Sequence, residues 1–140
     1  RGHEHAEHDG RRWPRGPHTT DALGYVIAGD STTYFAGDTD LYPGLGDEVS
    51  DVDTALLPVA GWGPSLGEGH LNPERAVAAA IAVGAVRSIP IHFGTLWPIG
   101  LSAVRSSMFH DPGAEFVRRA TAAGLSAIEL RPGESTEGRP

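Results

Sequence analysis

Short apolar runs separated by polar, glycine-bearing segments are the main pattern along this chain. Runs of this length, rich in β-branched and aromatic residues, predict strands rather than helices. They cover residues 23–28, 32–36, 54–59, 87–92 and 125–130. A Gly-Asp turn signal separates the first two runs, so we expect these two to form a β-hairpin. The polar residues 1–21 are expected to be the end of a strand that runs into a loop.

Two longer segments carry the signals of helix ends. Asn72 is a favourable N-cap and is followed by a proline and an acid, so a helix should cover residues 72–83 and stop at Gly84. An Asp-Pro start and a later glycine predict a second helix over residues 111–123. Residues 41–50 should form a loop with one helical turn. Because strands alternate with helices, the chain is expected to be a layered α/β domain.

The charge and the apolar runs exclude several classes of partner. The chain has 18 acidic and 11 basic residues and a formal net charge of −7. This balance argues against nucleic acid, whose phosphates need a basic surface, and against an anionic membrane surface. No apolar run approaches the roughly 20 residues of a membrane-spanning helix. No signal-peptide pattern is visible, so the expected location is the cytoplasm.

Histidine is abundant and cysteine is absent, which restricts the possible metal chemistry. The chain has seven histidines and no cysteine, so any metal must be held by His, Asp or Glu. His8 and Asp38 each follow a predicted strand and His92 ends one, and rigid strand ends commonly present side chains to a site. Imidazole and carboxylate suit zinc, manganese or iron. On this pattern alone, structural histidines remain an alternative.

Five short motifs occur in order along the chain. They read His-Asp-Gly-Arg, Phe-Ala-Gly-Asp-Thr, Leu-Leu-Pro-Val, Gly-His-Leu-Asn-Pro and Pro-Ile-His-Phe-Gly-Thr, and they begin at residues 8, 35, 56, 69 and 90. On these motifs the chain resembles the C-terminal half of metallo-β-lactamase-fold hydrolases, in the branch with ascorbate-phosphate lactonase-like and N-acylphosphatidylethanolamine phospholipase D-like enzymes. The resemblance implies an αββα sandwich, of which residues 1–134 are the C-terminal half and residues 135–140 a polar tail.

The resemblance also implies roles for individual residues. His8, Asp38 and His92 match metal ligands of the family, with Asp38 bridging two metals. His70 matches a histidine on the substrate side of the site, with packing before the helix cap as its alternative. Arg12 could bind an anionic group of the substrate, or be a solvated loop arginine. The implied activity is hydrolysis of a small-molecule ester, lactone or phosphodiester by a metal-bound hydroxide. Zinc is the expected cofactor, with manganese or iron as alternatives.

The family's His-x-His-x-Asp-His signature is missing from this chain. Residues 3–8 read His-Glu-His-Ala-Glu-His, but only two residues precede them, and Asp38 follows His8 too closely for the family's spacing. Three ligands cannot fill two metal sites. The chain is therefore expected to be part of a longer enzyme, paired with a missing N-terminal half or self-associating through an uncovered apolar sheet face. Two alternatives stay open: a non-catalytic half-domain with relic ligands, and a structural site for a single metal.

Three segments are candidates for setting substrate specificity, namely residues 41–50, 60–71 and 96–108. In the last of them, Trp97, Pro98 and Met108 could shape an apolar wall, with ordinary packing as the alternative.

Overall fold

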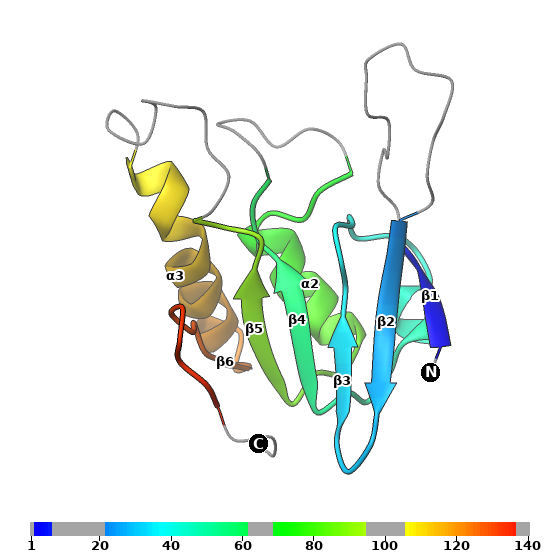
Figure 1. The fold of residues 1–140 in the computed structure, drawn as a ribbon. Coiled ribbons are helices and arrows are strands. Elements are labelled where there is room, and N and C mark those ends of the chain that lie inside the picture. The colour runs from blue at the N-terminus through cyan, green and yellow to red at the C-terminus, as the bar shows by residue number, and fades with distance from the viewer. Residues whose placement is uncertain (1, 7–21, 62–68, 95–105, 137–140) are drawn as a thin grey trace.

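The computed structural model describes residues 2–6, 22–61, 69–94 and 106–136. Figure 1 shows one mixed sheet and the helices beside it. The elements in chain order are β1 (Gly2–Ala6), β2 (Ala22–Ala28), β3 (Thr32–Phe35), α1 (Leu45–Glu48), β4 (Thr54–Pro58), α2 (Pro73–Ala82), β5 (Arg87–Ile91), α3 (Ser106–Ala122) and β6 (Ser126–Ala127).

The strands lie in the sheet in the same order as in the chain, from β1 to β6. β1, β2 and β3 are antiparallel, whereas β3, β4, β5 and β6 are parallel. The predicted hairpin is confirmed, because β2 and β3 pair directly across the turn that joins them. The predicted strand end near the N-terminus is also confirmed, since β1 pairs with β2 along its whole length.

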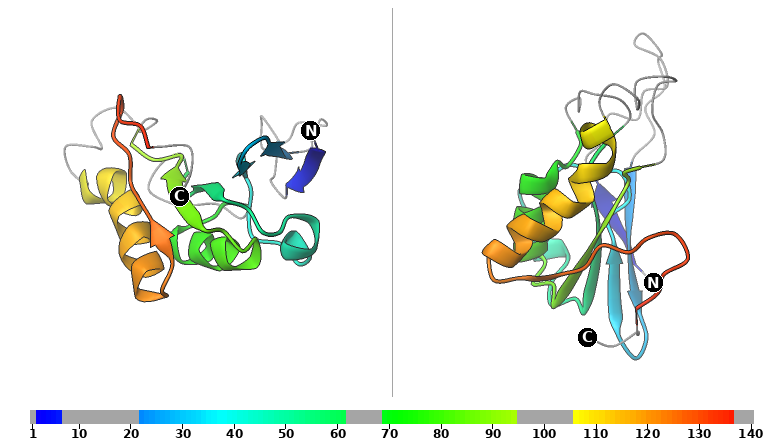
Figure 2. Two further views of the ribbon diagram at one scale, coloured as in Figure 1. Left: turned by 90° about the horizontal axis from the view of Figure 1, so that it is seen from below. Right: turned by 90° about the vertical axis from the view of Figure 1, so that its left-hand side faces the viewer.

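All three helices lie on one face of the sheet, as the two views in Figure 2 show. The core forms between this face and the helices. Small side chains on α2 allow close approach to the sheet, since Ala76 and Ala79 are fully buried. Phe116 of α3 fills the adjoining space, and Tyr34 and Leu57 cover it from the sheet side. On β3 only Tyr34 is fully buried, whereas the central strands β4 and β5 have successive buried residues.

The ends of α2 follow the local signals in the sequence. The Asn72 side chain accepts a hydrogen bond from the Arg75 backbone N–H at 2.9 Å, and a proline occupies the first turn. Gly84 has a φ of +60°, the left-handed conformation that terminates many helices. The predicted cap and stop are therefore both confirmed.

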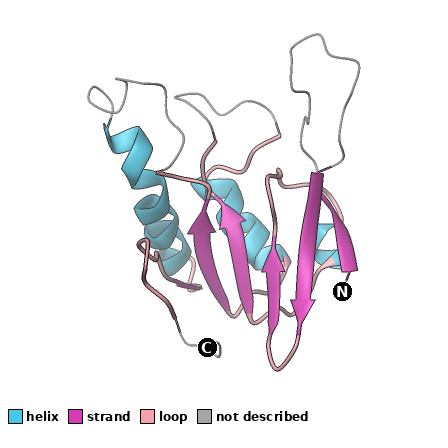
Figure 3. Ribbon diagram, viewed as in Figure 1, coloured by secondary structure: helices cyan, strands magenta, loops and turns pink. Residues whose placement is uncertain are grey.

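Two predicted boundaries near the C-terminus are wrong. α3 begins at Ser106 instead of residue 111, and Pro112 lies inside the helix. Proline fixes its own φ at a helical value, so a helical turn can precede Pro112. One backbone hydrogen bond of the helix is lost, because proline has no N–H. The last strand is only Ser126–Ala127 instead of residues 125–130, and the chain after it is loop (Figure 3). This edge strand pairs only with Arg87 and Ser88 at the start of β5, so its paired segment is two residues long.

The face of the sheet opposite the helices is apolar and exposed along β2. Leu23, Tyr25 and Ile27 alternate on this face and are 44%, 40% and 60% exposed. This agrees with the expectation of an uncovered apolar face. Within the described residues, no helix combines the length and apolarity needed to cross a membrane.

Candidate functional site

Asp38 follows β3 at the edge of the sheet where the parallel strands end. The arrows of β3, β4 and β5 point the same way in Figure 1, so the segments after them meet at one edge. Gly37, just before Asp38, has a φ of +71°, and a Cβ there would be 2.6 Å from the Leu23 carbonyl oxygen. Only glycine fits this turn without moving backbone. The glycine of the Gly-Asp-Thr motif therefore determines where the carboxylate emerges.

His92 and His70 reach the same edge from other elements. His92 directly follows β5 and has a φ of +61°, which is unusual for a residue other than glycine. His70 lies in the segment that leads into α2, after Gly69, whose φ is +88°. Both histidines thus lie in connecting segments, within three residues of a strand or a helix.

The structure brings Asp38, His70 and His92 together. His70 Nε2 is 3.6 Å from Asp38 Oδ2, and His92 Nδ1 is 3.8 Å from Asp38 Oδ1. Each carboxylate oxygen thus faces a different imidazole, at a separation longer than the ~2.7–3.2 Å of an ordinary hydrogen bond. The side chains are 39%, 22% and 37% exposed, respectively, so the cluster remains accessible from solvent.

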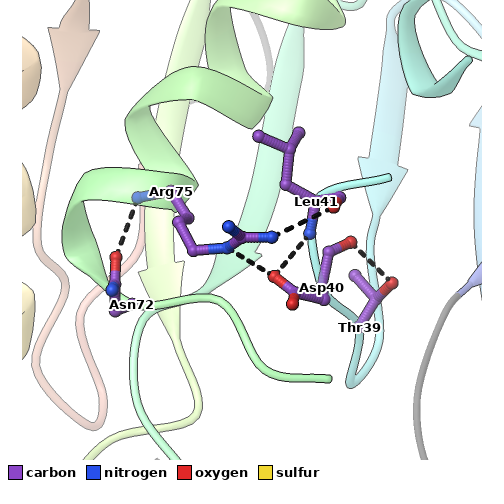
Figure 4. A network of polar contacts seen from close by, with 5 residues as sticks. All are labelled: Thr39, Asp40, Leu41, Asn72 and Arg75. Carbon is purple, nitrogen blue, oxygen red and sulfur yellow. Dashed lines mark hydrogen bonds and ion pairs between the residues drawn. The ribbon is translucent and has the colours of Figure 1, made fainter. Parts of the chain in front are cut away.

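A second polar network joins the segment after Asp38 to the start of α2 (Figure 4). Arg75 Nε donates to Asp40 Oδ1 at 2.6 Å, and Arg75 Nη2 donates to the Leu41 carbonyl oxygen at 3.1 Å. The Leu71 backbone N–H donates to the Thr39 carbonyl oxygen at 3.0 Å. The segment after Asp38 is therefore bonded both to the segment after His70 and to the first turn of α2.

The side chains of the cluster have the chemistry of metal ligands. Two imidazoles around a carboxylate are suitable donors for zinc, manganese or iron, and both carboxylate oxygens are directed at potential co-ligands. Among residues 2–6, 22–61, 69–94 and 106–136, however, no three His, Asp or Glu side chains form a group that could hold a metal by themselves. The donors fit in type, and a complete site needs ligands from elsewhere.

The other predicted site residues have mixed outcomes. His8 and Arg12 lie outside the described residues, as do Trp97 and Pro98. Met108 lies in α3, so the expectation of a loop over residues 96–108 is wrong for residues 106–108, and the role of this segment in specificity stays a prediction.

Asp40 and Arg75 were missed by the sequence analysis. Their side chains are bonded across 35 positions of the chain, and neither residue carries a recognisable motif of its own. In the sequence these two residues are marked only by their neighbours, since Arg75 follows a helix cap and Asp40 follows the Gly-Asp-Thr motif.

Comparison with known families gives a match over most of the chain. The family model of the β-lactamase superfamily domain matches residues 4–93. This range contains Asp38, His70 and His92.

Curated relatives match the chain over part of their own length. A UPF0173 metal-dependent hydrolase of Metallosphaera sedula is 34% identical over 122 residues, which are 84% of this chain and 47% of the relative. The N-acyl-phosphatidylethanolamine-hydrolyzing phospholipase D 1 of Caenorhabditis elegans is 30% identical over 102 residues, 68% of this chain and 28% of that protein. The chain thus spans about half of the length of the UPF0173 relatives or less.

Solved structures show the same fold. A metallo hydrolase of Ignicoccus hospitalis superposes with a TM-score of 0.69 at 22% identity, over 96% of this chain and 50% of the other. The metallo-beta-lactamase fold protein YhfI of Bacillus subtilis gives a TM-score of 0.57 at 16% identity, over 92% of this chain and 45% of the other. The chain therefore belongs to the β-lactamase superfamily and has part of the metallo-β-lactamase fold.

Proposed function

We propose that this chain contributes part of the active site of a metal-dependent hydrolase, with zinc as the metal. The observation that carries the proposal is the placement of Asp38, whose two carboxylate oxygens each face a different imidazole. Family membership supports it, since the named relatives include metal-dependent hydrolases.

The residues have separate roles in this proposal. Asp38 and His92 bind the metal, together with His8, and Asp38 uses both carboxylate oxygens. His70 lies on the other side of Asp38, where it orients the substrate. A metal ion held here supplies Lewis-acid chemistry that activates water and polarises the scissile bond. The substrate is an ester, lactone or phosphodiester, and the similarity to a phospholipase D makes phosphodiesters the first class to assay.

Catalysis in this proposal requires protein beyond the 140 residues. His8, Asp38 and His92 are too few to fill two metal sites, and the chain spans about half of its UPF0173 relatives. The exposed apolar face of β2 is where the remaining half of the domain would pack, because Leu23, Tyr25 and Ile27 lie there without helix cover.

The first test is metal stoichiometry. The chain is stripped with a chelator, reconstituted with zinc or manganese, and its bound metal is measured by elemental analysis. We expect less than two metals per chain, and Asp38→Asn should reduce the content further because it removes a charged ligand. Asp47→Asn is the matched control, since Asp47 is an exposed acid of α1 away from the site.

The outcomes separate the proposal from its alternatives. Two tightly held metals would contradict the proposal that the chain holds only part of the metal site. Residues such as His3 and His5 would then be ligands. Weak binding in no fixed ratio, unaffected by Asp38→Asn, would favour a non-catalytic module with relic ligands. A structural metal site would bind one metal, which would raise the melting temperature by mass action. Phosphodiester or lactone substrates would then not be turned over even when the rest of the domain is supplied.

A further inference from the structure

We propose that Arg75 is a positioning residue, which together with Asp40 sets the separation of Asp38 and His70. This inference rests on the proposed function, in which Asp38 binds the metal and His70 orients the substrate beside it. Arg75 itself does not touch the metal or the substrate in this proposal. It acts through the two loops that carry Asp38 and His70.

The need for such a residue follows from where Asp38 and His70 lie. Neither belongs to a strand or a helix, so the ladder of the sheet does not determine their separation. Asp38 is two residues from Asp40, and His70 is two residues from the helix cap Asn72. Whatever holds Asp40 against the start of α2 therefore also holds the carboxylate of Asp38 near the His70 ring.

Arg75 makes this connection with two nitrogen atoms of its guanidinium group. Nε donates to the Asp40 carboxylate at 2.6 Å, and Nη2 donates to the Leu41 carbonyl oxygen at 3.1 Å. Both acceptors belong to the loop after Asp38, as Figure 4 shows. A lysine has a single ammonium group at the end of a flexible chain and cannot reproduce this two-point geometry.

The anchor and the loop are themselves held in place. The backbone N–H of Arg75 donates to the Asn72 side chain at 2.9 Å, so the arginine belongs to a capped first turn. On the loop side, Asp40 Oδ1 also accepts from the Leu41 N–H at 2.7 Å. A backbone hydrogen bond from Leu71 to Thr39 joins the two segments directly. Movement of one loop against the other must break several of these bonds together.

Separation along the chain, and not burial, distinguishes this pair from an ion pair within one helix. The side chains of Asp40 and Arg75 are 21% and 43% exposed, and the pair joins distant parts of the chain. By contrast, Arg119 pairs with Glu115 one turn away on the surface of α3, where it can only stabilise its own helix. Arg119 is thus a matched control for the loss of one arginine–carboxylate pair.

The test is a cobalt(II) titration of the 140-residue chain, followed by visible absorption, with Arg75→Gln, Arg75→Lys and Asp40→Asn. We expect each variant to bind cobalt about 10-fold more weakly and with an altered spectrum, because the loop that carries the ligand Asp38 loses its anchor. Loss of groups that orient a metal ligand costs about 10–100-fold in affinity. The Asp40→Asn/Arg75→Gln double variant should lose little more than Arg75→Gln alone, because both changes remove the same contact. Arg119→Gln should keep the affinity and spectrum of the starting chain.

Thermal unfolding shows which variants are folded at the titration temperature. If Arg75→Gln fails to fold, the inference is tested with Arg75→Lys alone, because this variant retains the positive charge. Folded variants with unchanged cobalt affinity and spectrum would overturn it. If the starting chain binds no cobalt, metal binding requires the rest of the domain, and the positioning role is then read from the His70 ring signals by NMR. These should shift in Arg75→Gln but not in Arg119→Gln, and unchanged signals would overturn the inference.

Discussion

His92 adopts a left-handed backbone conformation with a φ of +61°, and Asp51 is the other non-glycine residue with positive φ in the described part of the chain. Histidine tolerates this region better than most residues, but the conformation still costs energy relative to glycine. Strained residues persist where the surroundings demand them, and they concentrate at functional sites. At His92 the conformation coincides with an imidazole that lies near Asp38, which supports the proposal that His92 is a metal ligand.

The strain at His92 can be measured by comparing two substitutions that remove its side chain. His92→Gly and His92→Ala both remove the imidazole and should both weaken metal binding. His92→Gly should be the more stable of the two by about 1 kcal/mol, because only alanine has a Cβ that is strained at positive φ. Chemical denaturation of the two metal-free variants gives this difference. Equal stabilities would mean that the backbone relaxes once the side chain is lost.

At the scale of elements, close contacts between backbones decide how helices pack. Gly46 of α1 shows this, because a Cβ on it would be 2.6 Å from the Ala82 carbonyl oxygen at the end of α2. α1 is a four-residue helix, so it depends on this contact more than on its own hydrogen bonds. The loop after Asp38 thus continues into a helix whose position is set by α2.

Replacement of Gly46 by alanine tests that contact. Alanine is normally favoured in a helix by about 1 kcal/mol over glycine. Here the clash with backbone should outweigh this preference and destabilise the chain by about 1–3 kcal/mol. Gly29→Ala is the control, since a Cβ on Gly29 would have the Ser31 carbonyl oxygen as its nearest neighbour, at 3.9 Å. A Gly46→Ala variant as stable as Gly29→Ala in urea denaturation would contradict the prediction.

At the scale of the whole molecule, helices cover one face of the sheet, and the opposite face is exposed along β2 (Figure 2). The open face presents Leu23, Tyr25 and Ile27, and apolar area of this kind favours association by roughly 25 cal/mol per Å² buried. In a longer protein this face would receive the rest of the domain. In the chain alone it remains available to a second copy.

Self-association should therefore depend on β2 and not on exposed apolar residues in general. Leu23→Ser/Ile27→Ser should shift sedimentation-velocity profiles of the 140-residue chain towards the monomer. Ile81→Ser is matched in exposure, at 58% against 60% for Ile27, but lies on α2 behind the sheet and should leave the profiles unchanged. A starting chain that remains a monomer at high concentration would contradict the prediction.

The sequence by itself determined the features that depend on neighbouring residues. The hairpin and both ends of α2 follow from short-range turn, cap and stop signals, whose physical basis lies within a few residues. The motifs containing Asp38, His70 and His92 placed each residue just after or before a regular element. Asp38 and His92 could therefore be named as site candidates from their positions, whereas His70 was named from the family resemblance.

Only the tertiary structure decided what depends on contacts between distant segments. The start of α3 and the length of β6 were wrong in the sequence analysis because packing and strand pairing overrode the local signals. The distances within the cluster and the bond between Asp40 and Arg75 join loops that the sheet brings together. Such contacts produce no periodicity or fixed spacing in the sequence, because only the folded chain brings the two partners together.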